Sequence, residues 1–202
     1  MSAARHLTPA LENGAVMTRE EFHSLYAECE GLERVELIEG VVYMPSPVRF
    51  ESHDRQASLL RGWLFTYSNL HDGLESGNEA TLILGNSEVQ PDAFLLRAGT
   101  VPIDEDGYLR GAPQLVAEVA ASTASRDLHS KLAVYQRNGV REYIVWRTLD
   151  NAIDWFVLRD GAYAAKAPDA AGRIESEEFA GLVMDVPAML SMDRKAVLAA
   201  LS

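Results

Sequence analysis

Residues 115–146 read LVAEVAASTASRDLHSKLAVYQRNGVREYIVW, and this stretch decides the fold class of the chain. Two apolar runs, at 115–121 and 142–146, have the length and composition of buried β-strands. Between them Leu128, Leu132 and Tyr135 repeat at helical spacing, and Gly139 follows where helices commonly end. A strand, a helix and a second strand in this order predict the connecting unit of an α/β sheet.

The segments on either side of this unit predict a more mixed, α+β-like order. Thr18 and Glu21 form a capping box that opens a first helix, and residues 53–70 form a second, amphipathic helix. Residues 35–44 predict a hairpin that turns at the Glu39-Gly40 pair. The remaining expected elements are strands at 80–84, 89–96 and 153–158, a polar loop at 97–112, and a last helix after Asp193.

Length and composition indicate a single globular domain. The chain has 202 residues, of which 48% are hydrophobic and 24% are charged, so it can bury a sizeable core. We expect a flexible N-terminal arm at 1–17 and one domain over 18–202. No apolar run approaches the roughly 20 residues that span a bilayer, and the N-terminus lacks a secretory h-region. The single cysteine, Cys29, cannot form an internal disulfide, which suits a reducing cytoplasm.

The charge of the chain argues against extensive contact with nucleic acid. The formal net charge is −12, whereas a duplex-binding protein usually presents a basic face. Residues 114–147 are the exception, with five basic and three acidic residues, a local balance of +2. Two surplus charges are weak evidence, because a solvated helix face would give the same count.

Asp92 and Glu118 are the strongest candidates for a chemical role. Glu118 lies in an apolar strand, where a carboxylate is costly to bury unless it is paired or bound to a metal. The alternative is that Glu118 faces water on an edge strand. The periodicity of the sequence supports the buried and the exposed interpretation equally. Two carboxylates on neighbouring strands would suit Mg²⁺ or Mn²⁺, which keep several waters and bind phosphate oxygens.

Three further residues could act beside these carboxylates. Lys131 could stabilise charge on a phosphate, although Asp127 lies four residues before it and a surface ion pair would explain both. Because Lys131 lies at the border of the helix face, its removal is expected to cost little stability. Glu36 could add a ligand from the first hairpin, and His53 could assist proton transfer, although lone histidines at helix starts are more often structural.

The joint spacing of several motifs resembles the Uma2 family over about residues 33–163. The motifs that carry the resemblance are Glu36-Leu37-Ile38-Glu39-Gly40-Val41-Val42, Met44-Pro45-Ser46-Pro47, His53, Pro91-Asp92, Gly111-Ala112-Pro113-Gln114-Leu115-Val116, Glu118-Val119, Asp127, Lys131, Tyr135, Gly139-Val140 and Glu142-Tyr143.

The Uma2 family belongs to the restriction-endonuclease-like PD-(D/E)XK superfamily, so the resemblance implies a mixed β-sheet flanked by helices. It implies Asp92 and Glu118 as metal ligands. Lys131 would replace the motif lysine, moved from the strand to the following helix because position 120 is alanine. Glu36 and His53 match positions that line the same pocket in the family.

Three hypotheses about function follow. The first is a Mg²⁺- or Mn²⁺-dependent endonuclease that cleaves DNA, acting as a cytoplasmic homodimer that addresses both strands. The second is a nuclease-like fold kept as a binding or assembly module without catalysis, which the acidic balance favours. The third is hydrolysis of another phosphate ester. Retention of Asp92, Glu118 and Lys131 together favours the first.

Overall fold

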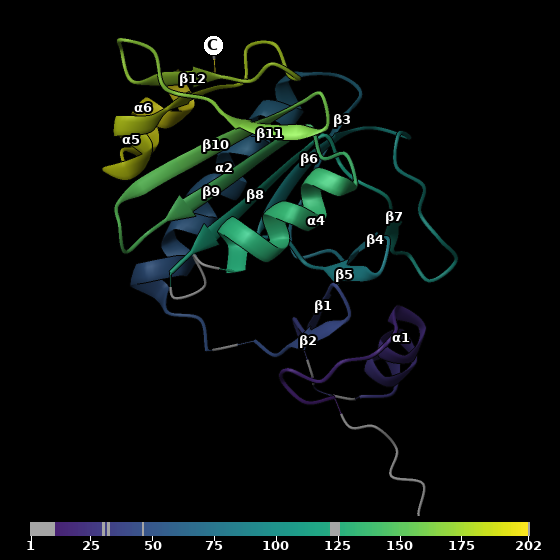
Figure 1. Ribbon diagram of the computed structural model, residues 1–202. Coiled ribbons are helices and arrows are strands. Elements are labelled where there is room, and N and C mark those ends of the chain that lie inside the picture. The colour runs from purple at the N-terminus through teal and green to yellow at the C-terminus, as the bar shows by residue number, and fades with distance from the viewer. Residues whose placement is uncertain (1–10, 30, 32, 46, 122–125, 202) are drawn as a thin grey trace, which may run out of the picture.

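A six-stranded mixed sheet forms the centre of the molecule in the computed structural model, which describes residues 11–29, 31, 33–45, 47–121 and 126–201 (Figure 1). We call it the large sheet, and its strand order is β11-β10-β9-β8-β6-β3. The strands are β3 (Leu74–Gly77), β6 (Ala93–Arg97), β8 (Leu115–Ala120), β9 (Glu142–Arg147), β10 (Ala152–Arg159) and β11 (Ala162–Ala165).

The strand-helix-strand unit predicted from residues 115–146 is present at the centre of the large sheet. β8 and β9 are parallel and adjacent, with Leu115 opposite Glu142, whereas the other pairs are antiparallel. The connection contains a π-helical turn, Asp127–Lys131, that continues into α4 (Leu132–Arg137). Ser125, the expected cap of this helix, lies outside the described residues.

Each face of the large sheet is covered by helix. The long α2 (Arg55–Leu70) buries Leu60, Trp63, Leu64 and Tyr67 against one face, together with α5 (Val186–Leu190), α6 (Arg194–Ala199) and the β12 (Arg173–Glu175)–β13 (Val183–Asp185) hairpin. α4 covers the other face (Figure 1). Alternate residues of β8 point to opposite faces, so Ala117 and Val119 join the α2 core while Val116 and Ala120 join the α4 core. Glu118 lies between Val116 and Ala120 in this alternation, so its side chain is on the α4 side of the sheet.

A second sheet, which we call the small sheet, lies next to the α4 core. Its order is β2-β1-β5-β4-β7, formed by β1 (Glu36–Ile38), β2 (Val41–Tyr43), β4 (Leu82–Leu84), β5 (Ser87–Val89) and β7 (Leu109–Arg110). The predicted hairpin at Glu39-Gly40 is confirmed, and both residues have positive φ, at 54° and 80°. α1 (Arg19–Glu28) begins with the predicted capping box at Thr18 and Glu21.

Three parts of the strand prediction differ from the structure. The polar loop expected at 97–112 contains the short strand β7, which pairs with β4. Residues 89–96 were expected to form one strand, but they split between β5 of the small sheet and β6 of the large sheet. Pro91 lies between them and has no amide hydrogen to donate to a ladder, so the chain leaves one sheet there and enters the other. β3 was not predicted because its sequence, Leu-Glu-Ser-Gly, has low strand propensity.

Residues 11–17, the described part of the expected N-terminal arm, lie against β2. The amide of Gly14 donates to Val42, that of Met17 donates to Gly40, and Leu11 is buried. The division of the chain into an arm at 1–17 and a domain at 18–202 stays a prediction. Within the described residues, no helix is long and apolar enough to cross a membrane.

Candidate active site

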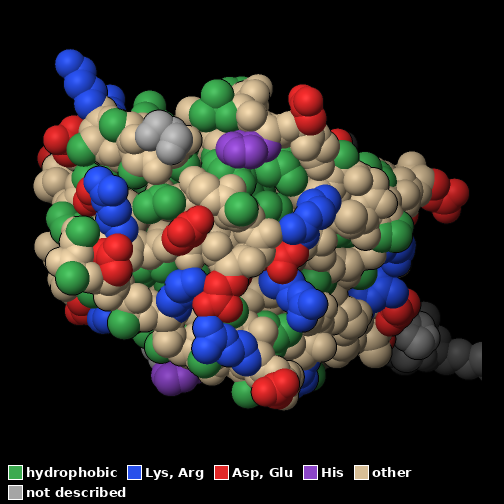
Figure 2. All heavy atoms as spheres, turned by 90° about the horizontal axis from the view of Figure 1, so that it is seen from above, with side chains coloured by type: hydrophobic (Ala, Val, Ile, Leu, Met, Phe, Trp, Pro, Cys, Tyr) green, Lys and Arg blue, Asp and Glu red, His purple; other side chains and the backbone are tan. Residues whose placement is uncertain are grey.

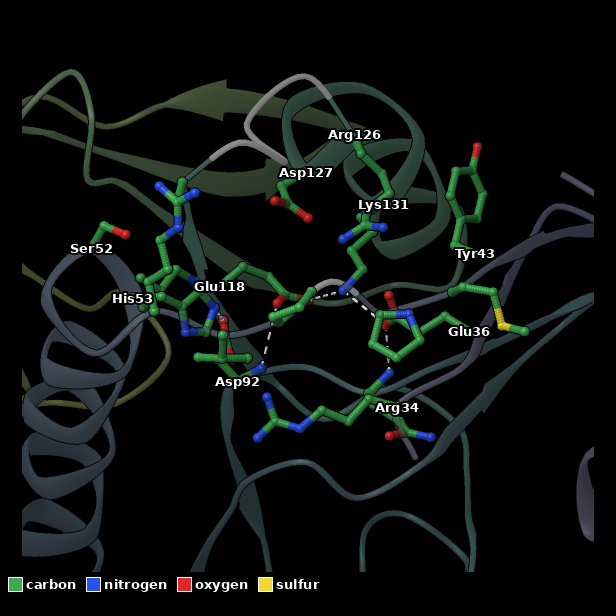
Figure 3. A pocket seen from close by; sticks show the side chains of 18 of the residues that line it. Arg34, Glu36, Tyr43, Ser52, His53, Asp92, Glu118, Arg126, Asp127 and Lys131 are labelled. Carbon is green, nitrogen blue, oxygen red and sulfur yellow. Dashed lines mark hydrogen bonds and ion pairs between the residues drawn. The ribbon is translucent and has the colours of Figure 1, made fainter. Parts of the chain in front are cut away.

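A pocket of about 430 Å³ lies at the junction of the two sheets and contains all five residues singled out from the sequence: Glu36, His53, Asp92, Glu118 and Lys131. They come from separate elements, namely β1, the turn before α2, the residue before β6, the middle of β8, and the π-helical turn before α4. The pocket therefore exists only once the large and small sheets have come together (Figure 3).

Asp92 and Glu118 lie on neighbouring antiparallel strands, with Ala93 paired to Ala117. The amide of Val119 donates to Oδ2 of Asp92 at 2.8 Å, and the amide of Asp92 faces Oε2 of Glu118 at 3.4 Å. Both side chains are buried and both line the pocket. The backbone of each strand thus orients the carboxylate of the other, and the two carboxylates face one space.

Lys131 points into the pocket and is only 3% exposed. Its Nζ lies 2.8 Å from Oε1 of Glu118 and 2.8 Å from Oε1 of Glu36. The alternative of a solvated surface pair with Asp127 is wrong, because both residues are buried. Removal of Lys131 would leave two buried glutamates unpaired, so the expectation of a small stability cost no longer holds.

Tyr135 is a member of the site that sequence reasoning assigned only to the core. Its ring packs in the α4 core, as its helical spacing predicted, but its hydroxyl donates to Oε1 of Glu118 at 2.8 Å. Lys131 and Tyr135 lie four residues apart, on one face of the helical segment. Both donors use Oε1, which leaves Oε2 facing the distant amide of Asp92.

Two basic side chains approach Asp92 from α2 and the turn before it. Nε2 of His53 lies 3.4 Å from Oδ2, and a guanidinium nitrogen of Arg61 lies 3.7 Å from Oδ1. Nδ1 of His53 is buried and has no hydrogen-bond partner among the described residues. His53 is thus held beside a carboxylate through one nitrogen, with the lone pair of the other available.

The protein shifts the pKa values of Glu118 and Asp92 in opposite directions. Burial raises the pKa of Glu118 to about 8 against the opposing charge of Lys131, and nearby carboxylates, Asp92 foremost, push it further upward. Burial also disfavours the charge on Asp92, but the hydrogen bond and charge of His53 and the Val119 amide outweigh it and lower its pKa. The pKa of Lys131 is raised, because the charges of Glu118 and Glu36 outweigh its burial.

The donor set fits a cation of the Mg²⁺ type. Within the part of the chain that the structure describes, no three His, Cys, Asp or Glu side chains come close enough to form a complete protein cage. Mg²⁺ does not need one, since it is commonly held by one or two carboxylates and completes its shell with waters and phosphate oxygens. Asp92 and Glu118 supply such a pair of oxygen ligands in one pocket.

Comparison with known proteins identifies the family and a related fold. The model of the Uma2 family, described as "Putative restriction endonuclease", matches residues 19–187. A crystal structure described as that of "a putative nuclease belonging to DUF820 from Anabaena variabilis" superposes with a TM-score of 0.70. Its sequence identity is 16%, and the alignment covers 87% of this chain and 98% of that one, so the likeness shows the fold. No curated protein matches the sequence. Because the family model spans most of its length, this chain belongs to the Uma2 family.

Proposed function

We propose that this chain is an endonuclease that hydrolyses DNA phosphodiester bonds with the help of Mg²⁺ or Mn²⁺. The observation that carries the proposal is the convergence of Asp92, Glu118 and Lys131 on one pocket from three separate elements. Membership of a family described as restriction endonucleases supports a nucleic-acid substrate. A cytoplasmic homodimer remains part of this proposal.

Asp92 and Glu118 would hold the cation. When bound, it would lower the pKa of a water to give a nucleophile and would offset charge on the phosphate. The amide of Val119 fixes the orientation of Asp92, and the hydroxyl of Tyr135 fixes that of Glu118. The backbone and the α4 core therefore hold both carboxylates in place before any substrate arrives.

Lys131 supplies positive charge where negative charge develops. Its ammonium is held between Glu118 and Glu36 in a buried site, where electrostatic interactions are stronger than in water. Glu36 acts as a positioning residue, because the backbone amide of Gln90 donates to its Oε1 at 2.8 Å and fixes it from the other side. His53 lies beside Asp92 through Nε2, and its buried Nδ1, which has no hydrogen-bond partner among the described residues, is the nitrogen that could take part in proton transfer.

Cleavage of supercoiled plasmid tests the proposal. Wild-type protein should convert it to nicked or linear forms with Mg²⁺ or Mn²⁺ and leave it intact with EDTA. Asp92→Asn and Glu118→Gln keep the shape of each side chain and should abolish cleavage. Glu142→Gln is the matched control, since Glu142 is equally buried but bonds Ser176 on the far side of β9 from the pocket lining. Equal cleavage by Asp92→Asn and wild type would refute the proposed site.

Two observations favour the second candidate, a nuclease-like binding module without catalysis. Lys131 already forms ion pairs with Glu118 and Glu36, so its charge has partners within the protein. The net charge of −12 also disfavours an extended contact with the DNA backbone. Such a module would leave plasmid and a small phosphodiester intact with every divalent cation, although its fold would be unchanged.

A further inference from the structure

The shape and lining of the pocket bear on which form of DNA could reach the carboxylates. Its volume of about 430 Å³ lies in the range of small-molecule sites, enough for about one nucleotide. Asp92, Glu118 and Lys131 are each at most 8% exposed. A phosphate within a duplex is part of a broad, stiff surface with neighbours on both sides. A single strand can bend and place one nucleotide into a recess.

The wall of the pocket opposite His53 carries a stacking surface. Tyr43 lies there at the end of β2, and Figure 3 shows Arg126 on the same side, above Lys131. The guanidinium of Arg126 lies over the Tyr43 ring, 5.4 Å from its centroid. Its Nε is buried and has no hydrogen-bond partner among the described residues. A planar cation on an aromatic ring is the kind of platform on which nucleic-acid bases stack.

The mouth of the pocket is apolar and has few basic groups available for phosphates. Val48 and Leu149 line it and are 49% and 71% exposed. Arg34 is paired with Glu79. Of the basic residues that line the pocket, Arg49 and Arg126 have no ion pair within the described part of the chain. Two free guanidiniums can replace the counterions of only a short stretch of backbone.

The face drawn in Figure 2 does not add a basic track. That face lies over the end of the molecule that carries β12, and its basic and acidic side chains are interspersed. At the ends of β10 and β11, Arg159 and Lys166 both pair with Glu177. An extended duplex would therefore gain little from contacts with this face.

We infer that the substrate of this site is single-stranded DNA, one nucleotide of which enters the pocket with its base against Tyr43 and Arg126 and its phosphate at the carboxylates. This inference rests on the proposed function and specifies its substrate. Arg49 and Arg126 bind the flanking phosphates. Val48 and Leu149 cover the apolar edges of the neighbouring bases.

Binding is measured first, because it is independent of turnover. A fluorescein-labelled oligonucleotide is titrated as a single strand and as a blunt duplex, with Ca²⁺ present and by fluorescence anisotropy. The single strand should bind at least about tenfold more tightly. A plot of the logarithm of its association constant against the logarithm of the salt concentration should have a slope of about −1.4, the value for two phosphate contacts on a single strand. Equal or tighter binding of the duplex, or no binding of either form, would overturn the inference.

Variants of Tyr43 test whether a DNA base stacks on this side chain. Tyr43→Ala should weaken single-strand binding about 5- to 150-fold, as expected for the loss of one stacked base, whereas Tyr43→Phe should stay within about twofold. Tyr108→Ala is the matched control, because Tyr108 is a half-buried tyrosine that packs on His23 outside the pocket. A melting curve for each variant shows that it is folded. Unchanged binding by folded Tyr43→Ala would overturn the stacking contact.

Hydrolysis of bis(p-nitrophenyl) phosphate separates this inference from the proposed function. If that small diester is cleaved with Mn²⁺ but duplex is bound as well as single strand, the nuclease proposal stands and the single-strand inference fails. If single strand binds with the expected Tyr43 dependence but neither the diester nor DNA is cleaved, the nuclease proposal fails and the binding inference stands.

Discussion

Lys131 places its ammonium 2.8 Å from Oε1 of Glu36, and this contact joins the helical connection of the large sheet to a strand of the small sheet. The same ammonium lies 2.8 Å from Oε1 of Glu118 on β8. One lysine therefore contacts buried carboxyl groups from both sheets. Because the three groups are nearly inaccessible to water, their charges must be balanced within the protein.

Lys131→Met should destabilise the fold as well as abolish cleavage. It removes the positive partner of two buried glutamates, and breaking a buried pair in this way costs about 3–5 kcal/mol. The loss should be smaller at pH 5 than at pH 8, because the orphaned glutamates can take up protons. Urea unfolding of the variant and of the wild type at pH 5 and pH 8 measures this loss in the free energy of unfolding.

The double variant Lys131→Met/Glu118→Gln is the control for charge. With Glu118 already neutral, the loss of Lys131 leaves one fewer buried charge unbalanced, so the double variant should unfold at higher urea than Lys131→Met alone at pH 8. Additive losses for the two substitutions would show that the pair contributes nothing to stability.

The stability of the wild-type protein should fall as the pH rises from about 4.5 to about 8. The pKa of Glu118 is raised from 4.5 to about 8 in the folded state. Within that window the unfolded chain releases this proton and the folded protein keeps it, so rising pH favours unfolding. Glu118→Gln cannot titrate and should show a weaker slope in thermal melts across the window. Identical slopes would mean that Glu118 is already ionised in the folded protein.

The structure shows which parts of this fold are specified locally. The capping box at Thr18 and Glu21 and the Glu39-Gly40 turn depend on neighbouring residues only, and both are present as predicted. The break at Pro91 could have been predicted, because proline cannot donate in a ladder. Assignment of β5 and β6 to two different sheets could not, since it depends on strand partners far away in the sequence.

The candidate site also contains residues that the sequence alone points to and a residue that only the tertiary structure identifies. Glu118 stood out because an acid interrupts an apolar strand, and that signal lies in the sequence itself. Tyr135 is among the residues that carry the family resemblance, but its bond to Glu118 left no comparable signal, because an inward-facing tyrosine on a helix looks like any other core residue. Only the tertiary packing shows that its hydroxyl reaches Glu118 and that Asp127 and Lys131 are buried rather than exposed.

Tyr135→Phe should raise the pH at which any metal-dependent activity begins. The tyrosine hydroxyl donates to Oε1 of Glu118, and a donor favours the ionised form of a carboxylate. Without it the pKa of Glu118 should rise further, so the activity profile against pH should shift upward. The rate of plasmid nicking from pH 6 to pH 10 measures the shift.

Tyr143→Phe is the matched control for this substitution. Tyr143 is also fully buried in the α4 core, and its hydroxyl donates to the backbone carbonyl of Asp127 instead of to Glu118. Both variants should lose about 1–2 kcal/mol of stability from the missing hydrogen bond. If both shift the pH profile equally, the effect comes from loosened packing and not from the bond to Glu118.

Binding of Mn²⁺ should release a proton from Glu118 at neutral pH. A metal ligand must be deprotonated, and with a pKa of about 8 the Glu118 carboxyl still carries its proton at pH 7. The low pKa of Asp92 means that it has no proton to lose there. Calorimetric titration in two buffers of different ionisation enthalpy should give close to one proton released per Mn²⁺ at pH 7 and little at pH 9. Mn²⁺ should also bind more tightly at pH 9, and Glu118→Gln should bind weakly at both pH values without proton release. Release of a full proton by that variant would place the titrating ligand elsewhere.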